Sequence, residues 1–253
     1  MAPPMRAPLG AAIALLLALS SLGGPLGTIL VALVAAGVAL LVASGWPDLL
    51  ELPSARGTRL VIGLTGIAGV GVALWSPGEI IPLQGVAMVG VLGLFLSFGQ
   101  QMARPRRTAL TLSLTGTVAG ALLTALSASW VQAQAEAAGA AAPVVTASAL
   151  ALTAALLLLA LPLPVRWRSS LAILAAAAVC PTVMSVLPLD VLGTSTVLAG
   201  LVLGAMIGIA AAAAHTLLDS QLVAEEPLPS LALAGAPVAT VGVIALVAVR
   251  LTS

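Results

Sequence analysis

The most constraining feature of this chain is an apolar stretch from Val191 to His215 that carries no charged side chain before its end. A helix of this length rises about 37 Å, more than the roughly 30 Å hydrocarbon core of a bilayer. Similar runs fill most of the 253 residues, which are 61% hydrophobic and only 7% charged. Soluble domains carry about 25% charge. The sequence therefore predicts a polytopic membrane protein.

The apolar runs predict an all-α bundle of about nine transmembrane helices. The loops are too short to hold a soluble domain, so residues 1–253 form a single integral membrane domain. The first run is marginal, because its helix rises only about 21 Å, which leaves eight spans as the alternative. Gly23, Gly24 and Pro25 predict a tight turn after it. The expected helices are 9–22, 26–45, 60–75, 83–99, 109–131, 144–161, 171–187, 191–215 and 231–249.

Two tryptophans mark expected membrane boundaries. Trp46 begins segment 46–59, whose two prolines predict a stretch lying along the interface, where amphipathic rings are favoured. Trp130 is expected at the outer end of the fifth helix, followed by a polar loop that holds Glu136.

The arginines predict the orientation of the bundle. With nine spans, eight of the nine basic residues, all arginines, fall on one side of the membrane, and only Arg250 falls on the other. Cytoplasmic loops collect Arg and Lys, so the N-terminus is expected inside and the C-terminus outside.

Small residues recur every fourth position in the stretch from Val191 to His215. This spacing places them on one helix face, where a second backbone can approach closely, as in a glycine zipper. Helix packing within the protein is one interpretation, and a homo-oligomer seam or a pore-lining face is the other. The third helix carries a second small-residue surface and is the expected partner. The packing residues are Thr196, Gly200, Gly204, Gly208 and Ala212, with Gly63 and Gly66 opposite.

Few ionisable residues are available for chemistry. Glu79 and Asp190 follow helix ends on the expected outer side, where they are either interfacial carboxylates or a cation or proton site. His215 and Asp219 share a face if the eighth helix continues into the cytoplasm. They are either an interfacial pair or a base or metal-ligand pair, although zinc needs three or four protein ligands.

Several classes of function receive no support from the sequence. It contains no phosphate-binding loop, haem-type His pair, zinc-protease motif or nucleophile elbow, so no cofactor and no catalytic residue is predicted. The short arginine clusters are explained by topology rather than by nucleic-acid binding. Lys and Tyr are absent, which is typical of a GC-rich genome.

Two segments resemble a group of uncharacterised multi-pass membrane proteins of actinobacteria. The first is GWPDLLELPSARGTR, with Gly45, Trp46 and Pro47, and the second runs from Phe98 to Trp130 around a basic loop. The resemblance covers about a third of the chain and implies a bacterial plasma-membrane location. It implies no particular activity.

These observations favour a non-enzymatic integral protein of the plasma membrane. It would be an accessory or packing subunit of an envelope assembly, or a simple permease, with the lipid bilayer as its main partner. A second copy or another membrane protein could pack on its small-residue faces. One alternative is a small-solute transporter that uses the outer carboxylates Glu79 and Asp190. The other is a membrane-interface enzyme that uses His215 and Asp219.

Overall fold

The predicted all-α membrane bundle is confirmed by a computed structural model of the chain. The structure describes residues 6–75, 82–104, 109–137, 142–186, 194–219 and 227–252. Within these ranges, eight helices are long and apolar enough to cross a membrane, and α1 is a shorter apolar helix. The helices are α1 Arg6–Ser21, η1 Gly24–Leu26 (a 3-10 turn), α2 Gly27–Leu49, α3 Ala55–Trp75, α4 Pro82–Met102, α5 Leu110–Leu126, α6 Ala128–Glu136, α7 Ala142–Ala160, α8 Val165–Val186, α9 Thr194–Asp219 and α10 Pro227–Thr252.

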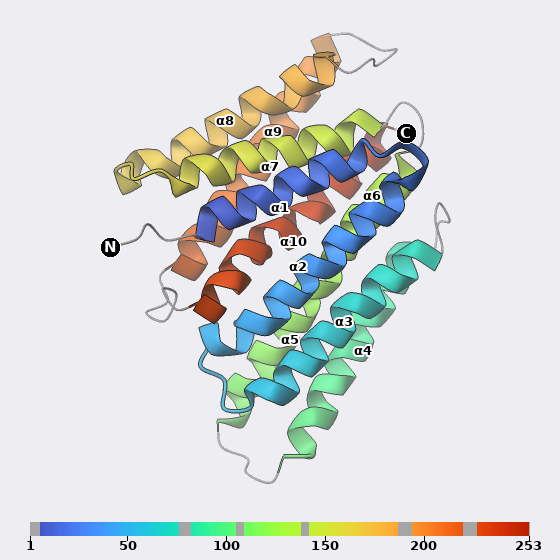
Figure 1. Cartoon of the computed structure of the whole chain (residues 1–253), viewed down its shortest axis with the longest axis vertical. Helices are drawn as coiled ribbons and strands as arrows, with labels where there is room; N and C mark the ends of the chain where they lie inside the picture. The colour runs from blue at the N-terminus through green and yellow to red at the C-terminus, as the bar shows by residue number, and fades with distance from the viewer. Residues whose placement is uncertain are drawn as a thin grey trace.

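The helices form two groups that meet at α2 and α10 (Figure 1). On one side α1 packs on α7, α7 on α8, and α8 on α9. On the other side α3, α4 and α5 pack on one another. α10 contacts α2 most extensively and also contacts α1, α5, α6, α7 and α9. The centre of the bundle is therefore α10, and not the stretch from Val191 to His215 whose length and small-residue stripe dominate the sequence.

Small residues bring the backbone of α10 against its neighbours. A Cβ added to Gly45 of α2 would overlap the carbonyl oxygen of Leu228 in α10. A Cβ on Gly235 of α10 would lie 2.8 Å from Cγ2 of Val42, and one on Gly10 of α1 would lie 3.0 Å from the carbonyl oxygen of Ala234. Because lipid gives no hydrophobic drive between helices, such van der Waals contact is what holds them together.

The tight turn after the first helix is present, and it requires glycine. Gly24 begins η1 with φ +57°, in the left-handed region that residues with a Cβ rarely adopt. The turn lets α2 run back beside α1 after only five residues, 22–26.

Two expected boundaries were wrong because buried side chains extend the helices. Segment 46–59 does not lie along the interface: α2 continues through Pro47 to Leu49, and α3 begins at Ala55. The fifth span is interrupted at Ser127 and continues as α6 to Glu136, where a polar loop was expected. Gln132 is 2% exposed, so this polar residue faces protein rather than water.

Trp46 and Trp130 are buried in the bundle and make the same contact with a neighbouring helix. The indole Nε1 of Trp46 donates to the carbonyl of Gly116 at 2.9 Å, and that of Trp130 donates to the carbonyl of Val238 at 2.7 Å. Each indole ring also lies against the glycine four residues after the accepting carbonyl. Trp46 lies against Gly120, and Trp130 lies against Gly242. Trp130 therefore does not mark the outer membrane surface.

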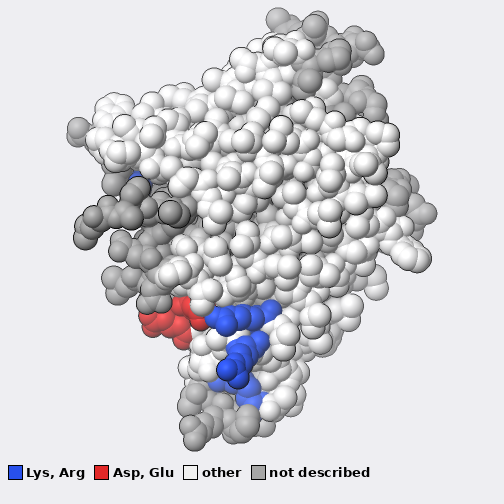
Figure 2. All heavy atoms as spheres, viewed as in Figure 1, with Lys and Arg blue, Asp and Glu red and all other residues white. Residues whose placement is uncertain are grey.

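Charge separates the two ends of the bundle. The helix ends that carry Arg56, Arg59, Arg104 and Arg168 form the Arg-rich end, and the opposite end carries Arg250 and Glu136. Figure 2 shows charged side chains at the lower and left margins of one face, with a broad uncharged surface beside them. Large apolar side chains such as Leu33 and Leu64 are exposed, as expected of helices that meet lipid.

Orientation in the membrane is testable at the C-terminus. A reporter active only in the cytoplasm, fused after Ser253, is expected to be silent, because the Arg-rich end should stay inside. The same reporter inserted between Arg104 and Ala109 should be active and serves as the control. Activity of the C-terminal fusion would contradict the nine-span orientation.

Candidate functional site

The small-residue stripe of α9 lies against α8. A Cβ on Gly204 would overlap the carbonyl oxygen of Ala176, one on Gly200 would lie 2.8 Å from Cα of Pro181, and one on Gly208 would lie 2.6 Å from Cα of Ile173. Ala212 is 5% exposed, and the side chain of Thr196 lies outside the described residues. These glycines are positions where two helix backbones meet.

The expected partner of this stripe was wrong. The atoms nearest Gly63 belong to Ala43 and Leu40 of α2, and those nearest Gly66 belong to Ala39 of α2 and Thr124 of α5. The two glycine-rich surfaces therefore serve different contacts, α9 with α8 and α3 with α2 and α5. The spacing of the residues shows that one helix face carries small side chains, but it does not identify the helix that packs against that face.

Most of the predicted polar residues have side chains outside those that the structure describes, so their pairing stays a prediction. Glu79 and Asp190 lie outside the described residues. α9 continues to Asp219, so His215 and Asp219 share one helix as expected, but the side chain of Asp219 is not among those described. His215 is half-buried at the Arg-rich end. Among the described residues, no three His, Cys, Asp or Glu side chains are grouped to hold a metal ion.

The hydroxyls of Thr182 and Ser185 form their hydrogen bonds within their own helix, α8. Thr182 donates to the carbonyls of Ala178 and Val179, and Ser185 donates to the carbonyl of Thr182. Hydroxyl groups in membrane helices are commonly satisfied in this way.

The Arg-rich end holds a polar network that joins α3, α4 and α5. Buried Gln101 donates to Ser113 Oγ at 2.8 Å and to Gln100 Oε1 at 2.9 Å, while Gln100 donates to Ser54 Oγ at 2.9 Å. Arg104 donates to Gln101 Oε1 at 2.7 Å and to Ser113 Oγ at 3.0 Å. Because these groups hydrogen-bond to one another, the role of the network is to hold the helix ends together.

Two grooves lie beside α10 in the described part of the bundle. The α4–α10 groove has a volume of about 540 Å³ and is walled by α4, α5, α6 and α10. The α9–α10 groove also has a volume of about 540 Å³ and is walled mainly by α9 and α10. Both are almost entirely apolar. Exposed lining residues show that they open sideways toward lipid: Val91, Leu122 and Val247 in the first, Leu198, Val202 and Met206 in the second.

The two grooves share one ridge. Val243 and Val247 of α10 line both cavities, and their spacing of four places them on one helix face. The grooves are therefore the two flanks of a single protruding stripe.

A polar stripe of α6 runs along the α4–α10 groove. Ser129 and Gln132 line the groove and are buried, and Glu136 follows on the same face at the helix end. There Glu136 accepts two hydrogen bonds from Arg250, from Nε at 2.8 Å and from Nη2 at 2.7 Å. The side chains of Arg250 and Glu136 are 36% and 15% exposed and line neither groove. The pair is close to both along the chain, because Gln132 of the α4–α10 groove lies four residues before Glu136 and Leu251 of the α9–α10 groove follows Arg250.

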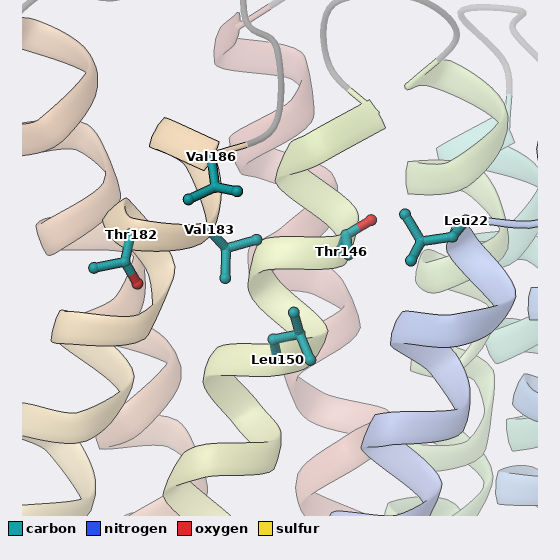
Figure 3. A pocket seen from close by; sticks show the side chains of 6 residues that line it. All are labelled: Leu22, Thr146, Leu150, Thr182, Val183 and Val186. Carbon is teal, nitrogen blue, oxygen red and sulfur yellow. The ribbon is translucent and has the colours of Figure 1, made fainter.

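A third, smaller cavity lies between α7 and α8 near the same end. Its volume is about 320 Å³, and Figure 3 shows its lining by Leu22, Thr146, Leu150, Thr182, Val183 and Val186. The polar groups of this lining are occupied: Thr146 shares a 2.8 Å hydrogen bond with Ser21, and Thr182 bonds to its own helix. All three cavities lie in the half of the bundle toward Arg250.

The fold and these lateral grooves define the class as a polytopic integral membrane protein. No protein-family model, curated protein or solved structure matches the chain. Sequence reasoning missed the grooves, although the spacing of Ser129, Gln132 and Glu136 was a readable signal of a polar helix face.

The glycine contact between α8 and α9 is testable by adding one methyl group. Gly204→Ala should lower the free energy of unfolding by about 1–3 kcal/mol, because its Cβ meets helix backbone that cannot move away. The matched control is Gly37→Ala in α2, where a Cβ meets nothing within 4 Å and alanine favours the helix. Denaturant titration in detergent measures both. Equal stability of the two variants would contradict the contact.

Proposed function

We propose that this chain is a non-enzymatic multi-pass protein of a bacterial plasma membrane that acts as a simple permease for apolar or lipid-like molecules. The observation that carries the proposal is the pair of apolar grooves beside α10, which open sideways and together offer about 1080 Å³, from 540 Å³ each. An apolar molecule enters such a groove directly from the hydrocarbon phase, so no aqueous path and no buried charge are needed.

The polar stripe of α6 supports a substrate that is lipid-like, with one polar end. Ser129 and Gln132 give the α4–α10 groove two polar groups in an otherwise apolar wall. Ligand sites commonly combine an apolar lining with a few polar groups that orient the ligand. The ion pair between Glu136 and Arg250 places charge where a polar end of the substrate would leave the bilayer.

A second candidate is an accessory or packing subunit of an envelope assembly. It is favoured by α8, which is the least buried of the spanning helices and exposes Leu174 and Trp167. A membrane partner, or a second copy of this chain, would cover this face.

The transporter and enzyme alternatives use other residues. A small-solute transporter would depend on Glu79 and Asp190, and a membrane-interface enzyme on His215 and Asp219.

Flux of a fluorescent phospholipid analogue between leaflets of proteoliposomes tests the permease function. The wild-type protein should accelerate flux over protein-free vesicles. Ala87→Trp and Ala199→Trp, which fill the two grooves from exposed helix positions, should reduce the acceleration. Met88→Trp changes the neighbouring side chain, which is 68% exposed and lines neither groove, and should leave flux unchanged.

No acceleration by the wild-type protein would contradict the permease. A stoichiometric protein partner retained in mild detergent would then favour the accessory subunit.

A further inference from the structure

We propose that the grooves bind one zwitterionic phospholipid with a primary ammonium, such as phosphatidylethanolamine. One acyl chain would lie on each flank of the ridge of Val243 and Val247, with the headgroup at the pair of Glu136 and Arg250. This ligand rests on the proposed function, because it names the lipid that the permease grooves accept.

The shape of the grooves matches two chains joined at one end. The cavities have equal volumes of about 540 Å³ and are separated only by the ridge that they share. Arg250 follows Val247 by three residues, so it lies one turn further along nearly the same face of α10. Two chains that straddle the ridge would therefore converge toward Arg250.

The charges at this point suit a zwitterion. Glu136 and Arg250 form a bidentate pair, so one negative and one positive group lie side by side at the helix ends next to the grooves. A headgroup with a phosphate and an ammonium places the phosphate toward Arg250 and the ammonium toward Glu136. An anionic headgroup would meet the repulsion of Glu136. Among the described residues, no further Arg at this end compensates for that repulsion.

The polar stripe of α6 lies at the depth where the ester groups of the phospholipid would lie, below its headgroup. Gln132 lies four residues before Glu136, about 6 Å deeper along the helix, and Ser129 lies about one turn deeper again. Ester carbonyls of a glycerophospholipid accept hydrogen bonds and lie just beneath its headgroup. The side chains of Ser129 and Gln132 make the wall of the α4–α10 groove polar at that depth.

Lipid retention by the purified full chain tests the proposal. After exchange into nanodiscs that hold equal phosphatidylethanolamine and phosphatidylglycerol, native mass spectrometry counts the lipids that stay bound on release. One phosphatidylethanolamine should remain, favoured about tenfold, as expected of a charge-assisted hydrogen bond. Ala87→Trp should lose it, and Met88→Trp should keep it.

The headgroup assignment is tested by reversing the preference. Glu136→Gln leaves Arg250 without its carboxylate and should shift retention toward phosphatidylglycerol. If this variant does not fold, the exchange Glu136→Arg with Arg250→Glu restores a pair and should again favour phosphatidylethanolamine. A pair that only joins α6 to α10 would change stability without changing lipid preference.

Equal retention of both lipids by the wild type, or an unchanged ratio in folded Glu136→Gln, would overturn the proposal. Retention without flux in proteoliposomes would contradict the permease alone. Flux without selective retention would contradict only the lipid assignment.

Discussion

Backbone contact between α2 and α10 is the interaction on which this bundle depends. Gly45 admits the carbonyl of Leu228, and Gly235 admits the side chain of Val42, so the two helices approach each other closely. In lipid, an apolar side chain gains little by turning from acyl chains to another helix, and close contact supplies the attraction instead. Since α10 also touches most of the other helices, a displacement at this crossing would spread through both helix groups.

The same packing accounts for the grooves. Small residues bring the first half of α10 against α1 and α2, whereas its second half presents valines and leucines to the cavities beside α4 and α9. Larger side chains hold those helices apart, and the space between them opens to lipid. Close backbone packing in its first half and cavity lining in its second half therefore both reside on one helix.

Hydropathy was sufficient to predict the class and the long apolar helices, and the glycines and proline at positions 23–25 predicted the turn at Gly24. The first of the nine expected spans is a shorter apolar helix. Hydropathy failed at Pro47 and at Gln132, where residues typical of loops are held in helices by burial. It also failed for the partner of the α9 glycines, because a small face accepts any helix that the rest of the packing brings to it. The grooves could not be predicted, since their volume depends on the crossing of four helices. Only the polar face of Ser129, Gln132 and Glu136 could be read in advance.

The pair of Glu136 and Arg250 also marks one end of the apolar length of the bundle. From Pro227 to Arg250, α10 rises about 34 Å, close to the roughly 30 Å of a bilayer's hydrocarbon core. The ionic groups Asp48 and Arg59 lie at the other end. A thicker bilayer would draw charges at one end or the other into hydrocarbon, which is costly, whereas a thinner one is met by tilting. Bilayer thickness, in addition to lipid chemistry, therefore determines the membranes in which this protein is most stable.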